Sequence, residues 1–166
     1  MNLWFRMFLY LLRLRQRPRT SPLDTTSLEF RVYPNDLDTN LHMNNGRYLT
    51  LMDLGRLDLV FCCGLGKAML TRGWRPVLGG SFITYRRELN PFQKFRLETR
   101  LLGWDGPWFY IGQQFYRGEQ LAAEAVVKAL FLDKNGKLDS AQVMQQIGYS
   151  DRSPELDPKT VARFAR

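Results

Sequence analysis

A chain of 166 residues has the length of one domain, and it can bury a core without disulfides or a structural metal. The composition is that of an ordinary globular protein, with 45% hydrophobic and 24% charged residues. The net charge is +8, but five arginines lie within residues 1–19 and no acidic residue precedes Asp24. The rest of the chain carries little excess charge and no RNA- or DNA-binding motif, so the sequence argues against nucleic-acid binding.

The sequence holds two cysteines, Cys62 and Cys63, and a single histidine, His42. Adjacent cysteines on a helix point to different faces and rarely form a disulfide, so we expect buried free thiols in a reducing, cytoplasmic setting. One histidine cannot build a multi-histidine site. We therefore expect neither a metal nor a cofactor.

Residues 1–19 are apolar and rich in arginine. A helix over 2–14 would be about 20 Å long, too short for a hydrocarbon core of about 30 Å. Arg6, Arg13 and Arg17 fall on one helical stripe, with apolar residues over much of the rest. This pattern predicts a helix lying peripherally at a membrane surface, with the later arginines meeting anionic headgroups. The alternatives are a helix packed on the domain or on a partner, and a signal peptide, which lacks a small-residue cleavage site here.

Residues 20–27 are predicted to link this segment to a domain over 28–138. The domain begins with a strand at 28–33, an Asp- and Asn-rich loop at 35–45 and a largely apolar, buried helix at about 46–63. Four strands in a consecutive antiparallel meander are then expected, at 77–89, 95–104, 108–116 and 121–132. Residues 139–166 are predicted to be a helical extension, with short helices at 142–147 and 158–165. One buried helix followed by a meander indicates an α+β fold.

One motif joins the loop to the first helical turn: Asp36-Leu37-Asp38-Thr39-Asn40-Leu41-His42-Met43-Asn44-Asn45-Gly46-Arg47-Tyr48. It is similar to the D-x-D-x-x-x-H-x-N-N-x-x-Y signature of the 4-hydroxybenzoyl-CoA thioesterase family, and most similar to the branch with membrane-associated thioesterase-superfamily-member-6-like proteins. The segments at 52–56 and 101–105 also resemble that family. The resemblance covers about residues 28–133 and implies the hotdog fold, a curved antiparallel sheet wrapped around one long buried helix.

The resemblance implies an acyl-thioester hydrolase with Asp38 as its catalytic carboxylate, acting either as a nucleophile or as a general base on water. It further implies that the backbone N–H of Asn45, at the helix start, binds the developing oxyanion. His42 is expected in a supporting role, either as an acid or base or by holding the loop through hydrogen bonds. For Asp38 the structural alternative is a turn residue.

Three residues are expected to bind the substrate. Tyr48 would line the acyl pocket, Asn44 would contact the substrate, and Arg86 or its neighbour Arg87 would meet the phosphates of the carrier. The structural alternatives are core packing for Tyr48, a helix cap for Asn44 and solvated surface for Arg86. The segment 104–108 lacks the basic cluster of the family pattern, so CoA and an acyl carrier protein both stay open as carriers.

Asp53 is a rival carboxylate, because another hotdog thioesterase branch places its catalytic acid at this helical position. The alternative, which we prefer, is a buried acid paired with Arg56. Two other functions stay open: a non-catalytic, membrane-tethered acyl-binding protein, and an enoyl-CoA hydratase, although hydratases space Asp and His by five residues rather than four. The resemblance also implies a homodimer or homotetramer, since the family's pockets lie between subunits.

Overall fold

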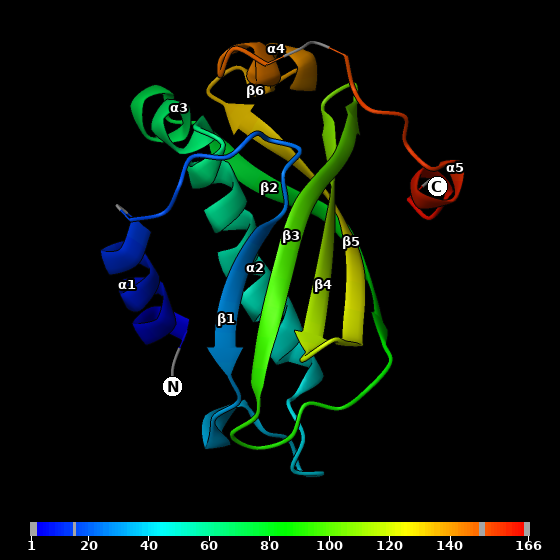
Figure 1. Cartoon of the computed structure of the whole chain (residues 1–166). Helices are drawn as coiled ribbons and strands as arrows, with labels where there is room; N and C mark the ends of the chain where they lie inside the picture. The colour runs from blue at the N-terminus through cyan, green and yellow to red at the C-terminus, as the bar shows by residue number, and fades with distance from the viewer. Residues whose placement is uncertain (1–2, 15, 150–151, 165–166) are drawn as a thin grey trace.

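The computed structural model describes residues 3–14, 16–149 and 152–164 (Figure 1). Its helices are α1 (Leu3–Leu14), the short 3-10 helix η1 (Pro34–Asp36), α2 (Asn45–Cys62), α3 (Leu65–Arg72), α4 (Ser140–Gln145) and α5 (Pro158–Ala162). Its strands are β1 (Thr26–Arg31), β2 (Arg75–Tyr85), β3 (Lys94–Asp105), β4 (Trp108–Arg117), β5 (Gln120–Asp133) and β6 (Gly136–Lys137). The strands form one antiparallel sheet that curls around α2, which confirms the predicted α+β hotdog architecture.

The order of the strands corrects one prediction. The sheet runs β1-β3-β4-β5-β2, with β6 paired to β5, so β2 pairs with β5 and not with β3. Of the four strands predicted for the meander, β3, β4 and β5 follow one another in the sheet as expected. The segment 86–93 is too long for a hairpin turn. It passes the N-terminal end of α2, where the Leu89 carbonyl accepts a hydrogen bond from the Met43 N–H at 2.9 Å. This crossing leaves β1 and β2 as the two edges of the sheet.

Helix α2 runs through the centre of the fold, as its nearly all-apolar sequence predicts, and Leu51, Met52 and Leu54 are almost fully buried. It passes closest to the sheet at Gly55. A Cβ atom there would lie 2.5 Å from the Thr99 hydroxyl oxygen, so the absence of a side chain permits the contact. Helix α3, only eight residues long, was not predicted, because such a short segment carries little periodic signal.

Helix α1 lies beside the edge strand β1 and is docked onto the domain (Figure 1). The Arg6 side chain is only 5% exposed, and it forms an ion pair with Asp36, which is 1% exposed. Beyond the helix, Arg17 forms an ion pair with the fully buried Asp58 at 2.6 Å. The expectation that Arg17 meets lipid headgroups is therefore wrong, because a buried carboxylate engages it.

The predicted linker also packs against the domain. The Thr20 N–H donates to the carbonyl of Cys62 at the end of α2, at 3.1 Å, and β1 already begins at Thr26. The predictions for the Arg13 side chain, for Arg15 and for the helix end at Ala165 lie outside the described residues. Of the described helices, none is long and apolar enough to span a bilayer.

Candidate active site

The loop that precedes α2 folds back on itself as a tight hairpin. The Asp38 N–H donates to the His42 carbonyl at 2.9 Å, and the Asn44 N–H donates to the Asp36 carbonyl at 2.8 Å. Leu41 turns the tip with a φ of 60°, a left-handed conformation that residues other than glycine rarely adopt. Such strain persists only where the surrounding structure imposes it, and it is concentrated at functional sites. The pairing brings Asp38 next to His42.

The Asp38 carboxylate uses its two oxygens differently. Oδ1 accepts hydrogen bonds from the backbone N–H groups of Asn40, at 2.8 Å, and His42, at 3.3 Å. Within the described part of the chain, no donor bonds to Oδ2. The first oxygen therefore performs the turn-stabilising duty expected of a loop aspartate, while the second stays available to a water molecule or a substrate.

The start of α2 lies directly after this hairpin. Asn44 caps the helix, since its Oδ1 accepts the Gly46 N–H at 2.8 Å, as the structural alternative for this residue proposed. Asn45 is the first helical residue, and its N–H has no acceptor among the described residues. The Tyr85 hydroxyl, at the end of β2, donates to the Asn45 carbonyl at 3.2 Å. Loop, helix start and strand end thus meet at one place.

Tyr48, on the first turn of α2, packs into the core. Its ring is buried and makes edge-to-face contacts with Tyr85 and Phe115, at centroid distances of 5.1 and 4.9 Å. The pKa of Tyr48 is raised to about 12, mainly because the side chain is buried and to a smaller extent because Tyr85 and Glu88 lie nearby. The structure thus gives Tyr48 the core position of its structural alternative, with a neutral hydroxyl near pH 7.

Arg86 and Arg87 follow the end of β2. Both backbone N–H groups donate to the Ala122 carbonyl, which is the hydrogen-bond pattern of a β-bulge. The two side chains therefore do not alternate strictly between the faces of the sheet as they would in a regular strand. The Arg86 guanidinium forms an ion pair with Glu124 at 2.5 Å. Arg87 is exposed and has no ion-pair partner among the residues that the structure describes. That Arg86 or Arg87 contacts the phosphates of the carrier stays a prediction.

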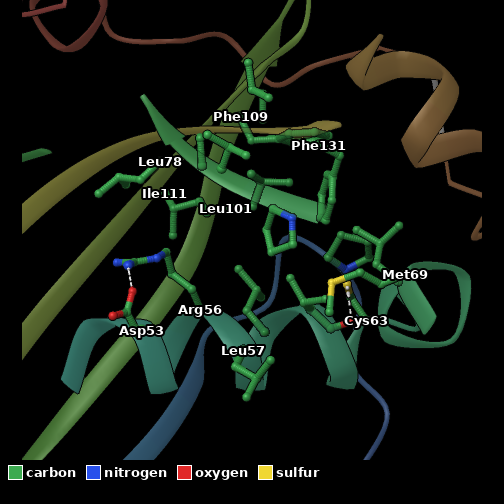
Figure 2. A pocket seen from close by; sticks show the side chains of 18 of the residues that line it. Asp53, Arg56, Leu57, Cys63, Met69, Leu78, Leu101, Phe109, Ile111 and Phe131 are labelled. Atoms are coloured by element: carbon green, nitrogen blue, oxygen red, sulfur yellow. Dashed lines mark hydrogen bonds and ion pairs between the residues drawn. The ribbon is translucent and has the colours of Figure 1, made fainter. Parts of the chain in front are cut away.

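A cavity of about 320 Å³ lies between α2 and the sheet (Figure 2). Its walls are apolar and include Leu57, Leu101, Phe109, Ile111, Ala129 and Phe131. Asp53 and Arg56 lie at one end of it, and Cys63 and Met69 at the other. Exposed Val77 and Leu78, on the edge strand β2, form part of its open side. Such an apolar space suits an aliphatic chain better than a charged nucleotide.

Asp53 lies at the rim of this cavity, and Asp38 is not among the residues that line it. The predicted ion pair between Asp53 and Arg56 is confirmed, but the predicted burial is wrong, since the Asp53 side chain is 63% exposed. Arg56 also donates to the buried Gln113 amide oxygen at 2.9 Å, and burial lowers the pKa of Arg56. The helix position of Asp53 therefore faces outward, next to the entrance of the cavity.

Three aromatic residues of strands β2 and β4, Phe82, Trp108 and Tyr110, lie outside the cavity. Phe82 and Tyr110 contact Phe164, which follows α5, at centroid distances of 4.9 and 6.0 Å, and neither lines the cavity. Trp108 also lies outside the cavity, and the ammonium groups of Lys128 and Lys137 are 4.5 and 5.6 Å from its ring. Two lysines from β5 and β6 therefore lie next to the segment 104–108.

The burial of Asp36 and Asp58 could not be predicted, because their arginine partners come from the distant N-terminal segment. The thiols carry no nucleophilic signature: burial raises the pKa of Cys63 to about 11 and also raises that of Cys62. Among the described residues, no group of three or more His, Cys, Asp or Glu side chains could hold a metal ion.

Comparison with known proteins bears directly on this site. The profile of the family described as "Thioesterase-like superfamily" matches residues 32–164, which include the loop, α2 and the whole meander. The chain belongs to this superfamily. Among individual superfamily relatives, Protein THEM6 of Xenopus laevis is 44% identical over 84 residues, which are 51% of this chain and 41% of that protein. The chain spans about half the length of the curated relatives it matches.

Solved structures of other proteins share the fold. YbaW, described as a probable thioesterase from Escherichia coli, superposes with a TM-score of 0.68 at 21% identity, over 73% of this chain and 94% of its own. The SAV2348 protein of Staphylococcus aureus, solved in complex with CoA, also gives a TM-score of 0.68, at 14% identity over 86% of this chain and 95% of its own. These likenesses support the hotdog fold and bear on the fold alone.

Proposed function

We propose that this protein hydrolyses acyl thioesters, with Asp38 as the catalytic carboxylate. The observation that supports this assignment most strongly is how the two Asp38 oxygens are used: two backbone N–H groups orient the side chain through Oδ1, and Oδ2 accepts no hydrogen bond from the residues that the structure describes. Membership of the Thioesterase-like superfamily supports the reaction class. The free Asn45 N–H, at the positive end of the α2 dipole, supplies the donor that a developing oxyanion requires.

Two chemical routes fit this arrangement. As a general base, Asp38 takes a proton from water, the resulting hydroxide adds to the thioester carbonyl, and collapse of the tetrahedral intermediate releases the thiol and the carboxylic acid. As a nucleophile, Asp38 expels the thiolate to form a mixed anhydride, which water then hydrolyses to the acid. In both routes the Asn45 N–H stabilises the oxyanion, and His42 supports the reaction by holding Oδ1 through its backbone N–H.

The cavity favours an aliphatic acyl group. It follows α2 from Asp53 to the C-cap residue Cys63, and at the helical rise these ten steps cover about 15 Å, the length of an extended chain of roughly twelve carbons. Among the described side chains that line it, only those of Asp53, Arg56 and Cys63 carry a polar group that could meet a ring hydroxyl, which disfavours hydroxylated aromatic acyl groups. The carrier, CoA or an acyl carrier protein, would lie outside, where Arg87 is an exposed cation.

The active form is proposed to be a homodimer or a homotetramer. Strand β2 is an edge strand, so one side of its backbone has no strand partner, and Val77, Leu78 and Tyr85 on it are exposed. Leu49 on the outer face of α2 is exposed as well. Pairing of two β2 edges would bury this apolar surface and cover the open side of the cavity. Light scattering coupled to gel filtration tests this, and a monomer would contradict it.

Release of free thiol from saturated acyl-CoAs of increasing length tests the proposed function, with ultraviolet detection of enoyl-CoA hydration run in parallel. Thiol release with a preference for aliphatic chains is expected. Hydration of enoyl-CoA without hydrolysis of any saturated thioester would make the protein a hydratase. Saturable acyl-CoA binding without either reaction would leave it a non-catalytic acyl-binding protein.

A further inference from the structure

Helix α1 turns its large apolar side chains away from the domain. Trp4, Phe5, Phe8, Leu11 and Leu12 are all exposed, Trp4 at 74%, and their spacing places them on one helical face. We propose that this face, called here the α1 outer face, docks the protein onto an anionic lipid surface. The proposal concerns a surface separate from the candidate active site and does not depend on the hydrolase activity.

The amphipathicity of α1 is the reverse of that expected for a helix that merely covers its own domain. Such a helix buries its apolar stripe and exposes its cations. Here the cation Arg6 is buried with Asp36, Tyr10 is buried near it, and the apolar stripe faces outward. A contiguous exposed apolar patch of this kind marks an interaction surface.

The composition around the patch identifies a lipid surface as its partner. Tryptophan and phenylalanine are favoured at the interface between headgroups and acyl chains. The chain directly after the patch is basic: Arg13, Arg15 and Arg19 occur within seven residues without an acid, and Arg19 is exposed. Arginines next to an apolar face are complementary to anionic headgroups. A helix of twelve residues is about 18 Å long, which suits insertion parallel to the surface.

The docking of α1 makes this a rigid attachment. The Arg6–Asp36 ion pair fixes the first half of the helix, and Arg17 fixes the chain beyond it by bonding to Asp58 and to the Ser27 carbonyl. Asp36 belongs to the hairpin that carries Asp38, since its carbonyl accepts the Asn44 N–H. The membrane-facing helix and the candidate catalytic loop are therefore held in one fixed orientation.

Sedimentation with lipid vesicles tests the proposal on the whole chain of 166 residues. Leu12→Glu changes the α1 outer face, and Leu70→Glu is the matched control, because Leu70 is an equally exposed leucine (72%) on α3, away from α1. The wild type and Leu70→Glu are expected to pellet with phosphatidylcholine vesicles that contain phosphatidylserine, and less with pure phosphatidylcholine. Most of the Leu12→Glu protein should stay in the supernatant. Point substitution is preferable to removal of residues 1–19, which would leave Asp36 and Asp58 buried without their arginines.

Three results would overturn the proposal: a wild type that stays in the supernatant, equal pelleting of the two variants, or equal binding to charged and uncharged vesicles. Gel filtration tests whether a second copy of the chain, and not a lipid surface, covers the α1 outer face. A smaller oligomer for Leu12→Glu alone would show that a second copy does so and would also overturn the proposal. The wavelength of tryptophan emission gives an independent measure of lipid contact, since Trp4→Phe removes the fluorescent side chain but keeps the α1 outer face apolar. Anionic vesicles should shift the wild-type emission to the blue, and Trp4→Phe should lose most of that shift while still pelleting.

Discussion

Replacement of Arg6 by methionine tests how the N-terminal helix is joined to the domain. Methionine keeps much of the apolar stem but removes the guanidinium from Asp36, a carboxylate that is only 1% exposed. Loss of one partner from a buried ion pair costs about 3–5 kcal/mol. We expect the lower end, because Asp36 keeps the Tyr33 N–H at 2.9 Å and the Arg47 guanidinium at 3.7 Å.

Urea denaturation measures this loss. With a slope of about 2 kcal/mol per molar, a loss of about 3 kcal/mol lowers the midpoint by roughly 1.5 M. Arg31→Met is the matched control, since Arg31 is exposed on the neighbouring strand and should change the free energy of unfolding by about 0.5 kcal/mol or less. Adding Asp36→Asn to Arg6→Met should recover part of the loss by neutralising the stranded charge. Equal midpoints for Arg6→Met and the wild type would refute the reasoning.

Three further predictions concern the core and the cavity. Because its folded-state pKa is raised from 10.0 to about 12, Tyr48 stabilises the fold fully below pH 10 and loses that contribution as the pH rises to about 12; Tyr48→Phe should flatten the decline of stability over this window in urea titrations at fixed pH. Gly55→Ala should lower stability by about 1–3 kcal/mol in the same assay, because the new methyl group would clash with Thr99, and an unchanged midpoint would contradict the close approach. Ala129→Phe should narrow the cavity and lower kcat/KM for long acyl-CoAs more than for short ones, whereas a uniform change across chain lengths would argue that the acyl group binds elsewhere.

The elements with strong local signals were predicted well from the sequence. The apolar run of α2 and the turns between β3, β4 and β5 fix those elements within a few residues. The position of β2 beside β5 depends on a chain crossing that no local pattern encodes. The same limit applies to charge, since the pairs Arg6–Asp36 and Arg17–Asp58 join residues 30 and 41 positions apart.

The candidate site was predicted in part. The motif led to the loop and to the helix start, and the structure adds how the Asp38 oxygens are used and that Asn44 serves as a cap. The packing of Tyr48 and the ion pair of Arg86 could not be read from the motif, because both depend on neighbours contributed by other strands. The predicted N-terminal helix is present as α1, but the burial of Arg6 and the ion pair of Arg17 could not be predicted, because both depend on acids that are far away in the sequence.

The most direct test of the central claim compares Asp38→Asn with Asp53→Asn in thiol release from a saturated acyl-CoA. Both substitutions remove one carboxylate charge, and neither side chain is fully buried, so both proteins should fold. We predict that Asp38→Asn abolishes thiol release, while Asp53→Asn, which loses only the ion pair at the cavity rim, retains most of it. Thiol release at the wild-type rate from Asp38→Asn, with loss of activity in Asp53→Asn, would contradict the account and move the chemistry to the helix.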